Sequence, residues 1–341
     1  MSAVPPAAVA TEEPPCPLCA DASPPTRLLR SGDVATDWPG EYGIVRCGAC
    51  GLAFTSPRPT PSELGRFYEA IYAGDNAGEM RRMQTEGGSE VILRARWRSL
   101  RKIVRDAGGA DGPGTRLLDV GCGYGGFLRA AGEGGEWQLS GCDTSAGSIE
   151  GTVAPASAKL VAADVADAGY PEDHFDVVTL YHCLEHTPAP VAELAEAHRI
   201  LKPGGLALVE VPHFGGLWRR PFGRYWFPLL LPQHLNHFEM PTLRRAFVDA
   251  GFGQVVLQRG AWAPIELVFS MGLLLKAIFG KAPEGRRPVG KWLLHKLLGL
   301  GLTAAFFFVD LPLSLLLART RLSGHHVAVA RKIQGRDTVA P

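Results

Sequence analysis

The chain has 341 residues, and its 35 basic and 34 acidic side chains leave a formal net charge of +1. This balance gives no reason to expect a nucleic-acid-binding protein, since such proteins carry a clear excess of positive charge. With 46% hydrophobic residues, the composition is that of a globular protein. The length allows one large domain with additions.

The N-terminal stretch MSAVPPAAVATEEPP has neither a basic start nor an apolar run. It therefore does not read as a secretory signal, and we expect a cytoplasmic protein. Its proline and alanine content predicts a disordered tail over residues 1–14.

Four of the seven cysteines form two CxxC pairs, Cys16 with Cys19 and Cys47 with Cys50. A two-residue gap lets both thiolates of a pair reach one tetrahedral metal ion, so the pattern predicts a structural zinc ribbon over residues 15–56. Disulfides do not suit a reducing compartment, and redox sites need a catalytic context that is not visible here. The other three, Cys122, Cys142 and Cys183, lie in apolar stretches typical of buried thiols.

A helical connector is expected over residues 57–108. Its last helix, from Ser89 to Asp106, carries many basic residues: Arg94, Arg96, Arg98, Arg101, Lys102 and Arg105. A solvated basic face is the simpler interpretation, and contact with an anionic substrate or a membrane is the alternative.

The segment TRLLDVGCGYGGFLRAAG reads as a buried strand, a glycine-rich turn and a helix. Gly121, Gly123 and Gly126 satisfy the generic dinucleotide fingerprint, in which the missing Cβ atoms let backbone approach a ligand. Asp143 ends the next strand, where a carboxylate can accept hydrogen bonds from two ribose hydroxyls. Both NAD and S-adenosylmethionine have such a ribose.

Four motifs together, DVGCGYGG, AADVAD, FDVVTLYHCLEH and RILKPGGLALVEVP, occur in the order and spacing of class I S-adenosylmethionine-dependent methyltransferases. The chain resembles that family from about Arg116 to Phe252. The resemblance implies an α/β fold with a Rossmann-like seven-stranded sheet, a methyltransferase core over residues 109–260, and an enzyme that uses S-adenosylmethionine.

The resemblance also implies the cofactor site. Asp119 and the loop of Gly121, Gly123 and Gly125 would bind the methionine end, Asp143 the ribose, and Asp164 the adenine amine. Their neighbours Cys122, Val165 and Tyr181 complete the predicted cofactor site. A helix-capping role is the alternative for Asp164.

The sequence YHCLEH places His182, Glu185 and His186 in the HxxEH order of one class of zinc peptidases. Those enzymes need both histidines on one helix, whereas here a strand end and a turn are expected. We therefore predict that these residues line the methyl-transfer site. A narrower resemblance to ubiquinone-pathway O-methyltransferases suggests a divalent metal, although His182 stands where those enzymes have an acid.

An acceptor lid is expected over residues 213–240, where aromatic side chains mix with arginines and histidines. Within it, PQHLNHF resembles a segment of related bacterial methyltransferases. His234 is the preferred acceptor-side base. A histidine fixed in a turn by hydrogen bonds is the alternative.

A hydrophobic helical insertion is expected over residues 261–322, followed by a final core strand over 323–333. Its uncharged runs are shorter than the roughly 18 residues expected of a membrane span. Helices lying in the membrane interface would suit the basic flanks and a lipid-linked acceptor. Packing on the core or on a dimer partner is the alternative.

Zinc-ribbon members of this family resemble enzymes of bacterial glycan pathways. We therefore expect O-methylation of a sugar, a lipid-linked glycan or another small molecule, at the inner face of the membrane or in the cytoplasm. The alternatives are C-methylation of a nucleotide sugar, a catalytically silent scaffold and a dinucleotide oxidoreductase.

Overall fold

The computed structural model describes residues 9–72, 77–261, 266–279, 301, 304 and 306–333. The chain forms two compact units. The ribbon unit comprises Met1–Thr60, Pro212–Met240 and Arg259–His326, and the sheet unit comprises Pro61–Val211, Pro241–Gln258 and Val327–Pro341. The expectations for residues 1–8 and for most of the stretch 280–305 lie outside the described residues.

The sheet unit is built on a seven-stranded sheet with the order β12-β13-β10-β9-β6-β7-β8. Its strands are β6 (Arg116–Val120), β7 (Gln138–Asp143), β8 (Lys159–Ala162), β9 (Phe175–Tyr181), β10 (Leu201–Pro212), β12 (Gln254–Ala261) and β13 (His325–Arg331). The five strands from β10 to β8 pair in parallel. Their near-continuous burial explains the apolar runs seen in the sequence.

The last strand runs antiparallel to β10. The N–H of Gly204 donates to the carbonyl of Lys332 near the start of β10, and the N–H of His213 donates to the carbonyl of Gly324 beyond its end. The predicted return of the chain to the sheet after the insertion is therefore confirmed, and the sheet is the mixed, Rossmann-like one that was expected.

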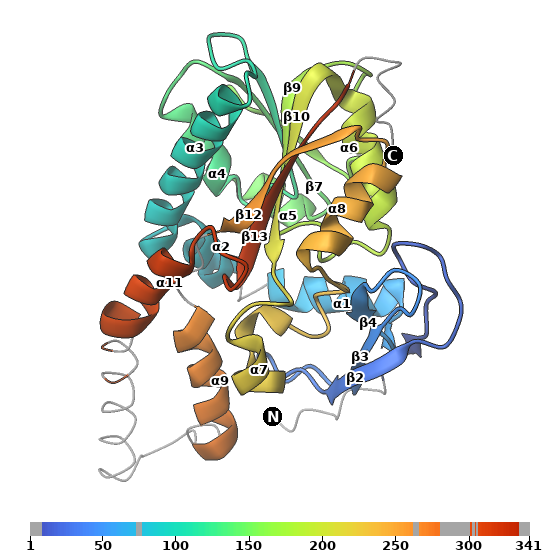
Figure 1. Cartoon of the computed structure of the whole chain (residues 1–341). Coiled ribbons are helices and arrows are strands. Elements are labelled where there is room, and N and C mark those ends of the chain that lie inside the picture. Colours follow the sequence, from blue (N-terminus) through green and yellow to red (C-terminus); the bar gives the residue numbers. More distant parts are fainter. Residues whose placement is uncertain are drawn as a thin grey trace. The chain divides into compact units, whose positions relative to one another are not determined.

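Helices cover both faces of this sheet (Figure 1). The helices α3 (Gly88–Asp106) and α4 (Gly126–Gly132) lie on one face, and α6 (Pro190–Ile200) and α8 (Met240–Asp249) lie on the other. The short α5 (Ala146–Glu150) follows β7. The predicted helical connector contains α1 (Pro61–Tyr72) and α2 (Ala77–Thr85) before α3.

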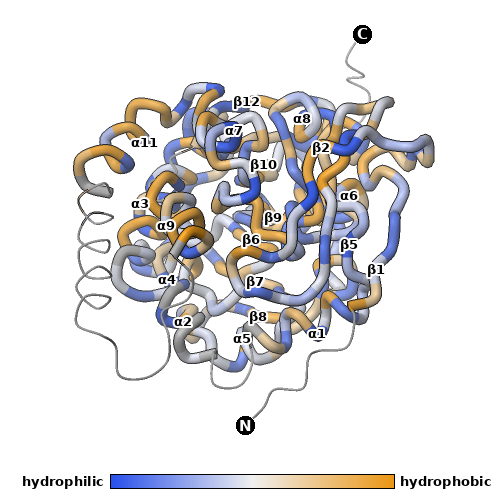
Figure 2. Tube along the Cα trace, turned by 90° about the horizontal axis from the view of Figure 1, so that it is seen from below, coloured by the Kyte–Doolittle hydropathy of each residue, from blue (hydrophilic) through white to orange (hydrophobic). Residues whose placement is uncertain are grey.

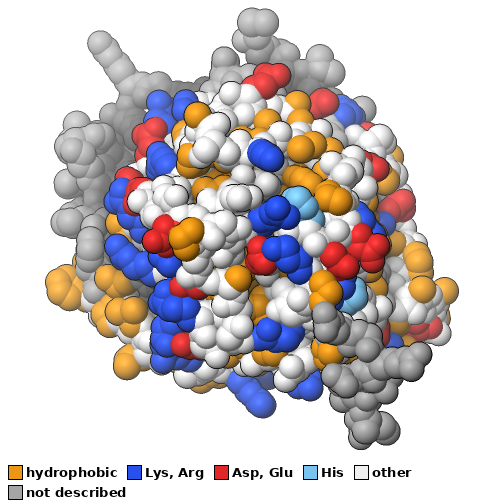
Figure 3. All heavy atoms as spheres, turned by 90° about the horizontal axis from the view of Figure 1, so that it is seen from above, with side chains coloured by type: hydrophobic (Ala, Val, Ile, Leu, Met, Phe, Trp, Pro, Cys, Tyr) orange, Lys and Arg blue, Asp and Glu red, His pale blue; other side chains and the backbone are white. Residues whose placement is uncertain are grey.

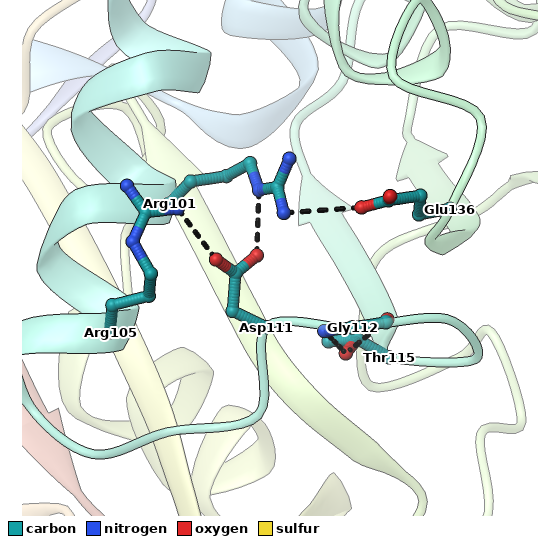
Figure 4. Close-up of polar contacts among 6 residues, drawn as sticks. All are labelled: Arg101, Arg105, Asp111, Gly112, Thr115 and Glu136. Carbon is teal, nitrogen blue, oxygen red and sulfur yellow. Dashed lines mark hydrogen bonds and ion pairs between the residues drawn. The ribbon is translucent and has the colours of Figure 1, made fainter.

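Most of the basic side chains on α3 are neutralised by carboxylates of the same unit. Arg101 bonds to Asp111 at 2.6 Å and to Glu136 at 3.2 Å, and Arg105 bonds to the second oxygen of Asp111 at 2.7 Å (Figure 4). Basic and acidic side chains are likewise interspersed on the face shown in Figure 3. The solvated, paired face is therefore the interpretation that fits α3.

The ribbon unit contains a four-stranded sheet of order β11-β4-β3-β2. Its strands are β2 (Thr26–Ser31), β3 (Tyr42–Arg46), β4 (Ala53–Thr55) and β11 (Asn236–His237). Because β11 comes from the segment predicted as a lid, that segment and the ribbon form one folded body. In addition, β1 (Thr11–Glu12) pairs with β5 (Arg58–Pro59), so part of the stretch predicted as a disordered tail is a strand instead.

The rest of this unit is helical. The lid segment forms α7 (Arg219–Phe222) and the 3-10 turns η2 (Gly223–Tyr225) and η3 (Phe227–Leu229). The predicted insertion forms α9 (Glu266–Phe279), the π-helical turn η4 (Phe306–Asp310) and α11 (Leu311–Leu317). No helix in the described part of the chain has the length and apolarity that a membrane span needs.

Candidate methyltransferase site

The glycine loop after β6 approaches its neighbours too closely for side chains. Gly121, Gly123 and Gly125 all have positive φ values, of 70°, 50° and 74°. A Cβ on Gly121 would lie 2.9 Å from the sulfur of Cys183, and one on Gly125 would lie 2.6 Å from the hydroxyl oxygen of Thr152. The predicted need for glycine at this turn therefore has a conformational and a steric cause.

Asp143 lies at the carboxyl end of β7, beside this loop. One of its oxygens accepts the N–H of Gly123 at 2.8 Å, and the other accepts the N–H of Ser145 at 2.9 Å. Burial raises the pKa of Asp143, and these two backbone hydrogen bonds oppose the rise. Since each carboxylate oxygen has two lone pairs, the group retains acceptor capacity for two ribose hydroxyls.

Asp119, at the end of β6, is almost fully buried and accepts a hydrogen bond of 2.7 Å from the hydroxyl of Thr179. Burial raises the pKa of Asp119 to about 7, although the Thr179 hydroxyl and the Arg96 guanidinium oppose the rise and Asp143 adds to it. A buried carboxylate near the loop would be favoured in its charged form by a sulfonium cation.

Asp164 is exposed in the turn after β8, and its carboxylate accepts the N–H of Ala166 at 3.0 Å. It therefore caps its own turn, as the alternative interpretation held. The adjacent Val165 is buried. Cys122 is buried too, and burial raises the pKa of its thiol. The ring of Tyr181 packs edge-on against Phe127, with its centroid 4.8 Å away.

His182 follows β9 in a turn, with a left-handed φ of 51°. Its Nδ1 lies 3.1 Å from Glu185 Oε1, and its Nε2 lies 3.5 Å from Glu210 Oε1. Burial lowers the pKa of His182, but the hydrogen bonds to Glu185 and Glu210 outweigh it, so that the pKa is raised overall. The two carboxylates therefore favour the charged form of the ring. Because both ring nitrogens face carboxylates, we derive no step through a divalent metal.

The peptidase interpretation fails on local structure, as expected, because His182 and His186 lie in a strand end and turns and not on one helix. Nδ1 of His186 lies 3.0 Å from the hydroxyl oxygen of Tyr68 on α1. Glu185 is fully buried. His182, Glu185 and His186, the three residues of the YHCLEH motif predicted to line the site, thus all lie in the sheet unit.

Two members of this cluster were not singled out from the sequence. Arg96 donates to Glu210 at 2.8 Å, and its guanidinium lies 5.1 Å from the centroid of the Tyr181 ring. The side chain of Arg96 is therefore an exception among the basic residues of α3, since it is turned inward. Glu210 lies near the end of β10. The only feature that marks it in the sequence is that it is an acid among apolar neighbours.

His234 lies in the ribbon unit and is buried. Its Nδ1 lies 2.9 Å from the carbonyl oxygen of Pro228, and its own carbonyl accepts the Thr55 hydroxyl at 2.7 Å. Because a carbonyl only accepts, Nδ1 carries the proton and the basic lone pair resides on Nε2. The structure thus supports the alternative of a turn histidine held by hydrogen bonds.

The four cysteines predicted as metal ligands form one cluster at the start of the ribbon unit. The sulfurs of Cys16 and Cys50 lie 3.5 Å apart, and those of Cys19 and Cys47 lie 3.6 Å apart. Zn–S bonds of about 2.3 Å in a tetrahedron place sulfurs roughly 3.8 Å apart. The positions of the four sulfurs therefore fit a zinc ion held by four thiolates.

Comparison with known proteins agrees with this geometry. A family model described as a methyltransferase domain matches residues 92–257. The demethylmenaquinone methyltransferase of Staphylococcus aureus is 32% identical, over 46% of this chain and 73% of that protein. The 2-phytyl-1,4-naphtoquinone methyltransferase of Synechococcus elongatus is 38% identical, over 42% of this chain and 58% of that protein.

A solved structure, Haemonchus contortus phosphoethanolamine N-methyltransferase 2 with S-adenosylhomocysteine, shares the fold at 16% identity with a TM-score of 0.50, covering 90% of this chain and 71% of that one. The chain belongs to the class I S-adenosylmethionine-dependent methyltransferases. It is an enzyme of that family, and its fold and fingerprint loop are those that the sequence motifs predicted.

Proposed function

We propose that the protein transfers the methyl group of S-adenosylmethionine to a small-molecule acceptor that carries a lipid tail. The observation that carries this proposal is the similarity of the methyltransferase core to enzymes named for demethylmenaquinone and 2-phytyl-1,4-naphtoquinone. A quinone with an isoprenoid tail is therefore the first acceptor to test.

A second acceptor class is a sugar or lipid-linked glycan, methylated on oxygen. It is favoured by the four-cysteine ribbon, which resembles that of methyltransferases in bacterial glycan pathways, and by the fit of the cysteine cluster to structural zinc. The nucleotide-sugar C-methyltransferase and the silent scaffold are not favoured, because the relatives are active methyltransferases of other acceptors.

Bound S-adenosylmethionine supplies a methyl group activated by its sulfonium charge. In the proposed site, Asp143 accepts hydrogen bonds from the ribose hydroxyls, Asp119 and the loop of Gly121, Gly123 and Gly125 hold the methionine end, and Asp164 with Val165 borders the adenine. His182, held between Glu185 and Glu210, orients the acceptor or its oxygen. His234 Nε2 is the proposed proton acceptor, and His186 positions Tyr68.

The test is a transfer assay with methyl-labelled S-adenosylmethionine and three acceptors: demethylmenaquinone in detergent, a lipid-linked glycan fraction and a nucleotide sugar. We expect label in the organic phase and a product mass increase of one methylene in the first or second reaction. Asp143→Ala serves as the cofactor-site control. Label only in the nucleotide sugar, or none in a protein that binds S-adenosylhomocysteine, would refute the lipid-tailed acceptor.

A further inference from the structure

An apolar and exposed surface is formed by side chains of the helices α9, η4 and α11 in the ribbon unit and of the turn that follows α11. We call it the apolar helical face, and it consists of Phe269, Ile278, Phe308, Leu315, Leu316 and Leu322. Their side chains are between 43% and 81% exposed. Scattered exposed leucines are ordinary, but six large apolar side chains on consecutive contacting elements mark an interaction surface.

One side of α9 packs against the core of the ribbon unit. Leu267, Met271 and Leu274 recur at helical spacing and pack against the core of the ribbon unit. Phe269 lies on the opposite side of the helix, whereas Ile278, four residues after Leu274, lies on the same side in the last turn, and both are exposed. The ribbon core therefore does not cover all the apolar side chains of α9, whose trace is coloured largely as hydrophobic in Figure 2.

Hydrogen bonds hold together the elements that carry the apolar helical face. The N–H of Val268 in α9 donates to the carboxylate of Asp310, at the end of η4, at 3.0 Å. Glu266 accepts the indole N–H of the buried Trp226. Since the start of α9 is bonded to the end of η4, the exposed side chains belong to a fixed surface and not to a loose end.

The charges beside this face have one sign. In the described residues of 266–279 and 306–324, the only acids are Glu266 and Asp310, and both are buried. The cations of the same segments are Lys276, Arg319 and Arg321. Lys276 pairs with Asp37 at 3.1 Å, whereas the exposed Arg319 and Arg321 form no ion pair with a described residue.

We propose that the apolar helical face docks on an anionic phospholipid bilayer, with its side chains among the acyl chains and Arg319 and Arg321 against the phosphates. Interfacial helices combine these two features, and exposed acids, which an anionic surface would repel, are absent from the described segments. The contact is peripheral, in keeping with the absence of a spanning helix among the described residues. Binding to the bilayer needs neither the acceptor nor the cofactor, so its test is independent of the test of the proposed function.

The test is flotation of the full chain with vesicles of phosphatidylcholine alone or with 30 mol% phosphatidylglycerol, roughly the anionic content of a bacterial inner leaflet. We expect binding to the anionic vesicles only, weakened by salt. Leu315→Glu with Leu316→Glu should lower the partition coefficient at least tenfold. Arg319→Gln with Arg321→Gln should lower it about 25-fold, since each surface cation contributes roughly a factor of five.

The matched controls are Val91→Glu on α3 and Val248→Glu on α8, valines that are 62% and 57% exposed outside this face. Both should bind vesicles as the wild type does, and thermal unfolding should confirm that every variant is folded. Absence of wild-type binding to anionic vesicles would overturn the proposal. So would equal loss in the valine controls, or a wild-type dimer in light scattering that Leu315→Glu dissolves, because a second copy would then cover the face.

Discussion

Thr55 and His237 are hydrogen-bonded at 3.1 Å, across 182 residues of sequence, inside the ribbon unit. The same Thr55 hydroxyl donates to the carbonyl of His234. The pair joins the N-terminal ribbon to the segment expected to be a separate acceptor lid. The ribbon is therefore part of the structure that holds His234 in its turn.

Replacing Thr55 with valine keeps the shape of the side chain but removes the donor to His234. A buried unsatisfied carbonyl costs about 1–3 kcal/mol, so we expect the free energy of unfolding to fall by about that amount and the melting temperature to fall with it. Thr26→Val, at the exposed start of β2, is the control and should change stability little. Equal melting of the two variants would argue against the Thr55 hydrogen bonds as a structural link.

Zinc removal should destabilise the ribbon unit. We expect one zinc per chain in the purified protein, lost in Cys50→Ser and retained in Cys183→Ser, whose thiol lies outside the cluster. Metal content measured by plasma mass spectrometry, with a chelator titration followed by thermal unfolding, checks this. Full stability without bound metal would contradict the ribbon as a zinc site.

The cofactor site can be tested by the stabilisation that S-adenosylhomocysteine confers. At about 100-fold over its dissociation constant the product should add about 2.7 kcal/mol to the wild type. Asp143→Ala should lose this shift, because its carboxylate is the proposed ribose acceptor, while Asp167→Ala in the exposed turn after β8 should keep it.

Asp164→Ala decides between the two interpretations of that residue. Weaker ligand stabilisation in this variant would support the adenine contact. A lower melting temperature with unchanged ligand stabilisation would support the capping of its own turn alone. NAD should stabilise none of these proteins, and a shift with NAD would instead favour an oxidoreductase.

The charge of His182 should depend on Glu185. Its pKa is raised in the folded protein, so its contribution to stability is complete below pH about 6.5 and is lost as pH rises through the folded value. In Glu185→Gln the pKa should fall toward the ordinary histidine value. Histidine ring signals followed by NMR titration check this, with Glu196→Gln on α6, whose carboxylate pairs with Arg199, as control. An unchanged titration would show that Glu185 does not set the charge.

The acids beneath the apolar helical face predict a second pH dependence. Burial raises the pKa of Glu266 to about 7 and that of Asp310 to about 6 in the folded protein. For an acid with a raised pKa the folded state loses stability as pH rises from the unfolded value near 4 to the folded value, on the order of 1–3 kcal/mol here. Glu266→Gln should flatten the decline in melting temperature between pH 5 and pH 8. An identical pH profile would contradict the assignment.

Several features of the fold and the site follow from local sequence. The strand, glycine turn and helix around Gly121 depend on neighbouring residues alone, because positive φ and close backbone approach need glycine wherever they occur. Asp119 and Asp143 lie at or next to the last residue of their strands, as the sequence pattern predicted. The spacing within each CxxC pair likewise predicted the four ligands, whereas the ribbon fold brings the two pairs together, with Cys16 beside Cys50 and Cys19 beside Cys47.

Other features depend on contacts between distant segments, which spacing along the chain does not reveal. Arg96 was grouped with the basic residues of α3, yet Glu210, 114 residues away, turns it inward. Glu210 itself looked like one acid in an apolar strand. The exposed side of α9 could not be told from the side that packs on the ribbon core, since both are apolar.

The sequence by itself determined the family, the order of the strands along the chain and the residues of the glycine loop, because these depend on local backbone preferences and short motifs. Only the tertiary structure decided that β11 completes the ribbon sheet and that His182 lies between Glu185 and Glu210. These depend on burial and long-range pairing, where one carboxylate or one hydrogen bond outweighs the local preference.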